Sequence, residues 1–292
     1  MSTTTPLTPP PVAGPPTTPG SPGAPGSPEG PGRPPRRTTA RVIAILAIVV
    51  GGILILGTVT AGIFSAVRAA TLRTETFTAD ATGIAALDID ISGASLTVEY
   101  GRDAALTVDG AAGDWRFERD GDVLRVTNER SWWTGWRWGG TDEAVLTLPS
   151  ALQRTAIDAE FGVSGGVLHA DGTYKDLDIE LAAGSIELSG TARDLDVDAS
   201  AGRTVFDLDD VDSADITLSA GAVTGTLTGS APTEVTADVS AGRLQLTLPD
   251  TAYAIASDVS AGEFRHTLTE DPASPHRVSV QVSAGAAILD RD

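Results

Sequence analysis

An all-β fold is predicted for most of this chain, and two features of the sequence predict it. From about residue 84 onward, apolar and polar residues alternate with a period of two, as in Leu87–Ile91 and Leu177–Leu181. This alternation is typical of strands that have one buried and one exposed face. A corner of small residues, most often Ser-Ala-Gly, also recurs every 18 to 23 residues, with its glycine at Gly184, Gly202, Gly221, Gly242, Gly262 and Gly285. We therefore expect a β-solenoid of about seven to eight coils of roughly 20 residues, with a β-sandwich as the alternative.

The N-terminal segments differ from this pattern. Residues 1–40 are rich in proline and glycine and are predicted to form a disordered tail, because they hold too few apolar side chains for a core. Residues 41–68 are predicted to form a transmembrane helix, since the run Val42–Val67 carries no charge and is long enough to cross a bilayer. More arginines precede this run than follow it, so the positive-inside rule places the N-terminus in the cytoplasm.

These assignments predict a single-pass protein of the cell membrane with an extracytoplasmic C-terminal domain. A linker is expected at 69–83. An N-terminal β segment with a tryptophan-rich hairpin is expected at 84–150, and the β-repeat solenoid at 151–292.

Composition excludes several classes of function. The chain has 39 acidic and 20 basic residues, a net charge of −19, so a nucleic-acid partner is not expected. It has no cysteine, which excludes disulfides, thiolate metal sites and cysteine nucleophiles. No phosphate-binding glycine loop leads into a predicted helix, and we expect no cofactor.

The strongest candidate for a contact surface is a short segment that holds four of the five tryptophans. The predicted ligand or partner contacts are Trp132, Trp133, Trp136, Arg137 and Trp138. Tryptophan beside arginine suits a membrane surface, the sugar rings of a cell-wall glycan, or an envelope protein. The alternative is that the indoles cover one end of the solenoid, and Trp115 on a neighbouring strand could join either arrangement.

A second pattern is acidic. Aligning the corners places two sets of carboxylates in register, namely Asp90, Glu160, Glu180, Asp198, Asp238 and Asp258, and then Asp88, Asp158, Asp178, Asp196 and Asp215. Like charges about 5 Å apart repel, so we expect relief from Arg203, Arg243 and Arg265, or from bound calcium. The calcium signal is weak because no calcium-binding loop is present, and a solvated acidic face is the favoured interpretation.

The corners, the alternation and the segment Val145–Pro149 resemble the bacterial putative-adhesin β-strand-repeat family of envelope proteins. The resemblance implies a β-solenoid and a non-enzymatic role. Gly162–Gly166 matches the G-x-S-x-G pattern of hydrolases, but a strand rather than a helix is predicted after it.

We therefore expect a non-enzymatic adhesin or envelope-binding module. The alternatives are an envelope-stress sensor, or a structural solenoid that associates end to end. A glycan-cleaving enzyme is the least favoured possibility.

Overall fold

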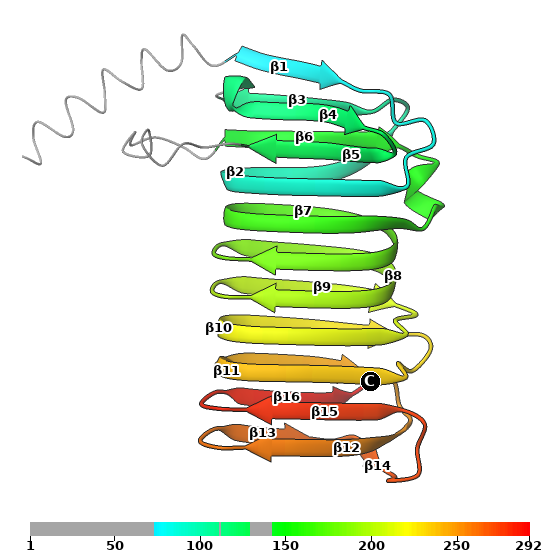
Figure 1. The fold of residues 1–292 in the computed structure, drawn as a ribbon, viewed down its shortest axis with the longest axis vertical. Coiled ribbons are helices and arrows are strands. Elements are labelled where there is room, and N and C mark those ends of the chain that lie inside the picture. Colours follow the sequence, from blue (N-terminus) through cyan, green and yellow to red (C-terminus); the bar gives the residue numbers. More distant parts are fainter. Residues whose placement is uncertain (1–72, 111, 129–141) are drawn as a thin grey trace, which may run out of the picture. The chain divides into compact units, whose positions relative to one another are not determined.

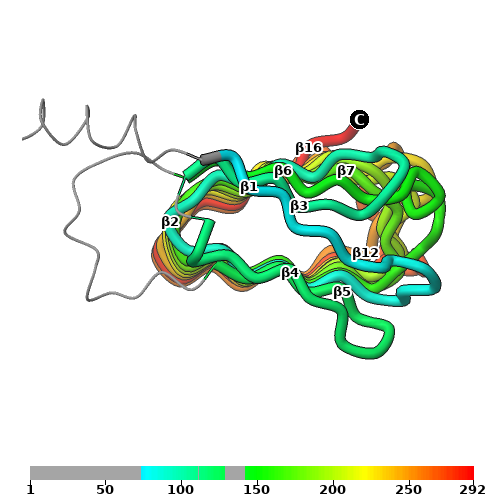
Figure 2. Tube along the Cα trace, turned by 90° about the horizontal axis from the view of Figure 1, so that it is seen from above, coloured from blue at the N-terminus to red at the C-terminus, as the bar shows by residue number. Residues whose placement is uncertain are grey.

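The computed structural model describes residues 73–110, 112–128 and 142–292. All of them lie in the second of the two units into which the chain divides, Thr58–Asp292. They form one sheet of 16 strands. Figures 1 and 2 show that this sheet winds around a central core, so that its strands stack above one another in two facing layers.

The strands are numbered in chain order. They are β1 (Arg73–Thr78), β2 (Ala86–Gly101), β3 (Ala105–Gly110), β4 (Trp115–Asp120), β5 (Val123–Asn128), β6 (Asp142–Pro149), β7 (Ile157–Leu181), β8 (Ser185–Ala199), β9 (Arg203–Asp209), β10 (Ser213–Thr228), β11 (Glu234–Leu248), β12 (Ala252–Val259), β13 (Glu263–His266), β14 (Thr269–Glu270), β15 (Arg277–Val282) and β16 (Ala286–Arg291). Two short 3-10 helices, η1 (Ala112–Asp114) and η3 (Leu152–Arg154), interrupt them.

The stacked strands pair in parallel and in register. We call one rung the strand that enters a corner together with the strand that leaves it. In β10, for example, the entering part pairs with Glu234–Val239 of β11 and the leaving part with Arg243–Thr247. Register is fixed because a slip of one residue would turn every apolar side chain outward.

Alternate side chains along each rung point into the core. In β11, Val235, Ala237 and Val239 are buried, whereas Asp238 between them is partly exposed. Each inward position lies directly over the equivalent position of the next rung, so that a single hydrophobic core runs from Ala81 to Leu289. Burial of these side chains is the main source of stability for the stack.

The corners need glycine for a specific steric reason. Gly184, Gly202 and Gly221 have φ of 108°, 109° and 97°, a region that other residues rarely adopt. A Cβ on Gly202 would lie 2.4 Å from the carbonyl oxygen of Gly184, the equivalent corner of the neighbouring rung. The recurrent glycine therefore allows the backbones of successive corners to approach each other closely.

The two ends of the stack depart from this pattern. At the N-terminal end the pairing is antiparallel between β1 and β3, between β3 and β6, and between β4 and β5. At the C-terminal end the strands do not follow chain order, since β15 lies between β11 and β12. β1 itself lies in the segment that the sequence predicted as a linker.

These findings correct the predicted fold class. The all-β character is confirmed, but a transmembrane helix followed by a β-solenoid of uniform coils was wrong as stated. The described residues form a single 16-stranded sheet, in which antiparallel strands and out-of-order strands replace uniform coils at its ends. Two separate sheets, as in a β-sandwich, are not found in the described residues either. The local alternation that predicted the strands does not encode which strands become neighbours at the ends.

The predicted localisation is corrected as well. The proline-rich tail (1–40) and the predicted membrane helix (41–68) lie outside the described residues. Within the part of the chain that the structure describes, no helix is long and apolar enough to cross a membrane. The structure thus gives no support to a single-pass membrane protein, because the expectation rested on hydropathy alone.

Candidate functional site

The predicted contact residues Trp132, Trp133, Trp136, Arg137 and Trp138 lie outside the described residues. The strands on either side define where this segment is inserted. Thr127 of β5 pairs with Asp90 of β2, and Asp142 of β6 pairs with Ala94 of β2. Residues 128–141 therefore occupy the place in the chain that residues 91–93 occupy at the corner of β2. The tryptophan segment is an insertion at one corner of one rung.

Trp115 is separate from this segment in its environment. Its side chain is 3% exposed and packs in the hydrophobic core at the start of β4. It lies opposite Asn128 in the antiparallel β4–β5 pair, and Asn128 is also buried. Because its ring is enclosed by protein, Trp115 belongs to the core rather than to an exposed contact surface.

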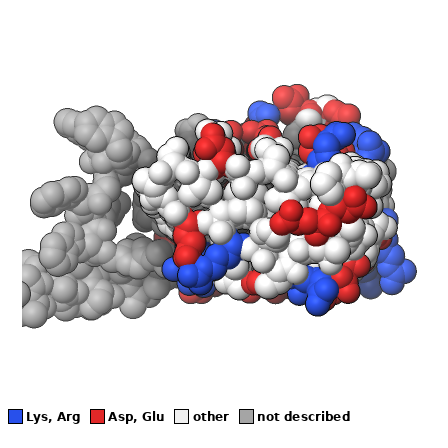
Figure 3. Space-filling model, turned by 90° about the horizontal axis from the view of Figure 1, so that it is seen from below, with Lys and Arg blue, Asp and Glu red and all other residues white. Residues whose placement is uncertain are grey.

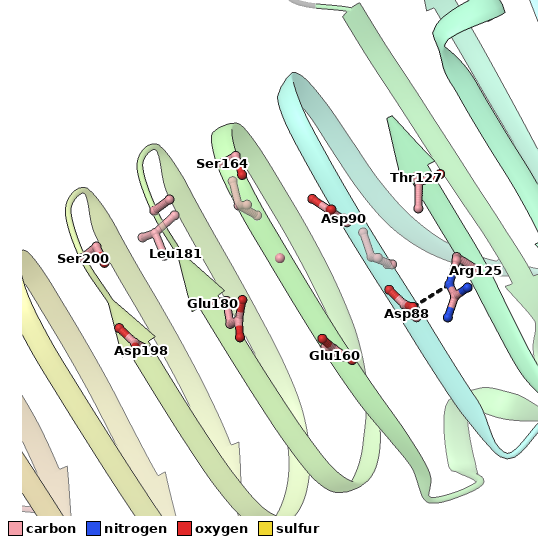
Figure 4. Close-up of a pocket in the computed structure, with 14 residues that line it drawn as sticks. Asp88, Asp90, Arg125, Thr127, Glu160, Ser164, Glu180, Leu181, Asp198 and Ser200 are labelled. Atoms are coloured by element: carbon pink, nitrogen blue, oxygen red, sulfur yellow. Dashed lines mark hydrogen bonds and ion pairs between the residues drawn. The ribbon is translucent and has the colours of Figure 1, made fainter. Parts of the chain in front are cut away.

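The acidic residues form a charged face over the entering strands of the rungs, as expected, but their alignment differs from the prediction. β2 pairs with β7 so that Asp88 lies beside Glu160, whereas the sequence alignment had placed Asp90 there. Register shifts next to Ser92 cause this difference of two residues. One column of the face consists of Asp88, Glu160, Asp178, Asp196 and Asp215. Figure 4 shows several of these carboxylates pointing to the same side of the sheet.

Mutual repulsion is visible in the ionisation of this face. The pKa of Glu160 is raised, first by burial and then by Asp88 and Asp178. Burial and the neighbouring Asp178 and Asp215 raise the pKa of Asp196. Both effects disfavour the charged carboxylate, so the ionised face weakens the fold locally.

The basic residues that relieve this repulsion are not the predicted ones. Arg203, Arg243 and Arg265 lie on strands that leave the corners, and Arg265 pairs with Glu263 of its own strand. On the acidic face, Arg125 donates a hydrogen bond of 2.7 Å from its Nε to Asp88. Lys175 bridges Asp158 and Asp176, with its Nζ 3.2 and 2.6 Å from their carboxylate oxygens. Arg193 and Arg277 make further ion pairs along the same face.

Two adjoining hollows lie on the acidic face, with volumes of about 500 and 630 Å³. They share Asp88, Arg125 and Glu160 as lining residues. Among the described residues, no group of three or more histidine, aspartate or glutamate side chains has the geometry of a metal site. The hollows form an anionic groove that attracts cations and repels anionic polymers.

Ser164, the serine of the G-x-S-x-G match, lines the smaller hollow at a corner within β7. β7 continues as a strand to Leu181, so the helix that a nucleophile elbow requires does not follow the serine. The match is therefore a corner of the sheet.

Comparison with known proteins identifies relatives by structure. No protein-family model and no curated protein matches the sequence. A putative adhesin from Bacteroides fragilis is 16% identical, with a TM-score of 0.44 over 75% of this chain and 97% of that chain. A putative cell adhesion protein from Clostridium sporogenes is 10% identical, with a TM-score of 0.30 over 76% of this chain and 100% of that chain.

A further structure, described as a putative lipid binding protein from Parabacteroides distasonis, is 14% identical. Its TM-score is 0.43 over 75% of this chain and 97% of that chain. The resemblance to putative adhesins found in the sequence is thus confirmed among solved structures.

Proposed function

We propose that this chain is a non-enzymatic binding module of the adhesin type, which contacts a glycan through the segment Trp132–Trp138. The observation that carries the proposal is the insertion of this segment at a corner between two strands that are both fixed in the sheet. In the neighbouring strand β2, three residues are enough to make the same corner. An insertion that is not needed to turn the chain, and that holds four indoles and a guanidinium, is suited to recognition.

The chemistry of the two surfaces favours a glycan over an anionic membrane. Indole rings stack on the apolar faces of sugar rings, and they desolvate at little cost in side-chain entropy. The acidic face repels anionic lipid surfaces, and its ion pairs with Arg125 and Lys175 are local and leave the face strongly negative. Binding through the indoles therefore combines best with an uncharged polymer.

The test is co-sedimentation of the full chain with purified cell-wall glycan. Replacing Trp132, Trp133, Trp136 and Trp138 together by alanine should reduce binding by about 100-fold or more, since buried tryptophan contacts are each worth about 2 kcal/mol. The matched control is Ser131→Ala with Thr134→Ala, which alters the same segment without removing an indole and should bind as the wild type does.

The fold of the four-tryptophan variant can be checked in the same samples. Trp115 is then the only tryptophan left, and its buried ring should keep the fluorescence of an enclosed indole. Equal binding of the folded variant and the wild type would contradict the proposal. Sedimentation of the wild type with anionic vesicles but not with glycan would contradict it too, and would point to a lipid surface.

A further inference from the structure

The last rungs of the stack are assembled out of chain order. The rung Arg277–Arg291, which we call the inserted rung, pairs on one side with β11. On its other side it pairs with β12 and β13, the end rung Ala252–His266. Figure 1 shows β15 and β16 between β11 and the earlier strands β12 and β13. The chain therefore passes over one position, builds the end rung, and returns to fill the gap.

Side-chain chemistry explains this order. The inserted rung turns Val278, Val280 and Val282 inward, and all three are buried. At the matching positions the end rung has Ser257 opposite Val280, and His266 opposite Leu289. The more apolar rung thus occupies the covered position, and the rung with polar inward residues is exposed at the end.

Charges on the outer face favour the same order. Gln281 separates Asp238 from Asp258, which would be direct neighbours if the rungs followed chain order. The guanidinium of Arg277 also lies 3.6 Å from the carboxylate of Glu234 on β11. Adjacent carboxylates repel and opposite charges attract, so both contacts stabilise insertion.

The end rung is the part of the stack that opens most easily. Only one of its two edges is paired along most of its length, apart from a short contact of β12 with β14. Val259 is 39% exposed, and Ile255 and Phe264 are only partly buried. Figure 3 views this end and shows mostly uncharged side chains across it, with charged ones mainly around the rim. An element with so little buried surface separates at a lower free energy than an internal rung.

Opening of the end rung uncovers one edge of the inserted rung, and its departure uncovers β11. The inserted rung is joined to the end rung through residues 267–276, a largely exposed connection that contains Pro272 and Pro275. We propose that a second copy of this chain is the partner of this end, and that two copies exchange their inserted rungs reciprocally. Each exchanged rung makes in the other copy the same strand pairs that it makes at home, so exchange costs little enthalpy.

Single cysteines can report this exchange, because the natural chain has none. Asp238 and Gln281 are register partners on adjacent strands, where Cα atoms lie about 4.8 Å apart and can be bridged by a disulfide. Full chains carrying Asp238→Cys or Gln281→Cys, one with a size tag, are mixed, warmed to the onset of unfolding, cooled and oxidised. We expect a covalent heterodimer, at least about tenfold more than from Asp238→Cys mixed with Asp198→Cys, whose rung is not exchanged.

Two single-chain variants make the result decisive. Asp238→Cys with Gln281→Cys in one chain should close without mixing, whereas Asp238→Cys with Asp258→Cys should not, because two strands separate about 10 Å. If the first variant closes and the mixed chains give only the control level of heterodimer, the proposal is wrong. Closure of the second variant would show rungs in chain order and would overturn it equally.

Discussion

At the scale of single residues, one buried hydroxyl stands out. Thr204 is fully buried on β9, and its register partners are Ile186 of β8 and Val223 of β10. Its Oγ1 has no hydrogen-bond partner among the described residues. A buried hydroxyl without a partner loses its hydration and gains nothing in return. Thr204 is therefore a weak point in an otherwise apolar column.

Replacing Thr204 by valine should stabilise the protein by about 1 kcal/mol, because valine has the same shape and no polar atom to desolvate. The matched control is Thr217→Val on β10, where the side chain is exposed and the change should stay within about 0.5 kcal/mol. Chemical denaturation of the three chains measures this difference. A loss of stability on Thr204→Val would mean that the hydroxyl has a partner in solution.

At the scale of the elements, the acidic face makes stability depend on pH. The pKa of Asp196 is raised, so the ionised side chain weakens the fold above that pKa, and protonation restores the stability below its ordinary value of 3.8. The pKa of Asp176 is lowered, chiefly by the hydrogen bond from Lys175. Asp176 therefore stabilises the fold above its ordinary pKa, and this stability is lost as the pH falls through the lowered value.

The two residues should respond oppositely to the same substitution. At pH 7, Asp196→Asn should raise the melting temperature by about 1–3 °C, because it removes repulsion on a partly screened face. Asp176→Asn should lower it. Both differences should shrink toward zero as the pH falls below 4. Melting curves between pH 3 and pH 7 provide the measurement, and the same sign for both variants at pH 7 would contradict this account.

Sequence reasoning predicted the strands well and their partners less well. Alternation and the glycine corners depend on local sterics and burial, which is why β7, β8, β10 and β11 follow the predicted pattern. The shift of Asp88 against Glu160 was missed because a bulge at Ser92 has no distinct residue signature. The inserted rung was missed too, although the spacing of 23 residues before Gly285, the longest among the corners, was a signal.

At the scale of the whole molecule, stability and recognition are carried by different parts of the sequence. The hydrophobic core and the glycine corners specify the stack, and a single corner carries the inserted tryptophan segment. No residue of the core predicts a ligand, so the function follows from the insertion and from the charge of the surface around it. The net charge of −19 keeps the molecule soluble and limits the partners it can approach.

The dependence of glycan binding on salt tests most directly whether the indoles carry recognition. Contacts made by desolvated indoles are little affected by screening, whereas contacts made by an exposed charged face weaken as the Debye length shortens. Between about 0.05 and 0.5 M salt, we predict that binding of the full chain to purified cell-wall glycan stays within about twofold or rises slightly, as screening removes repulsion by the acidic face. A fall of tenfold or more would show that charged groups carry the binding, and it would contradict the role assigned to Trp132–Trp138.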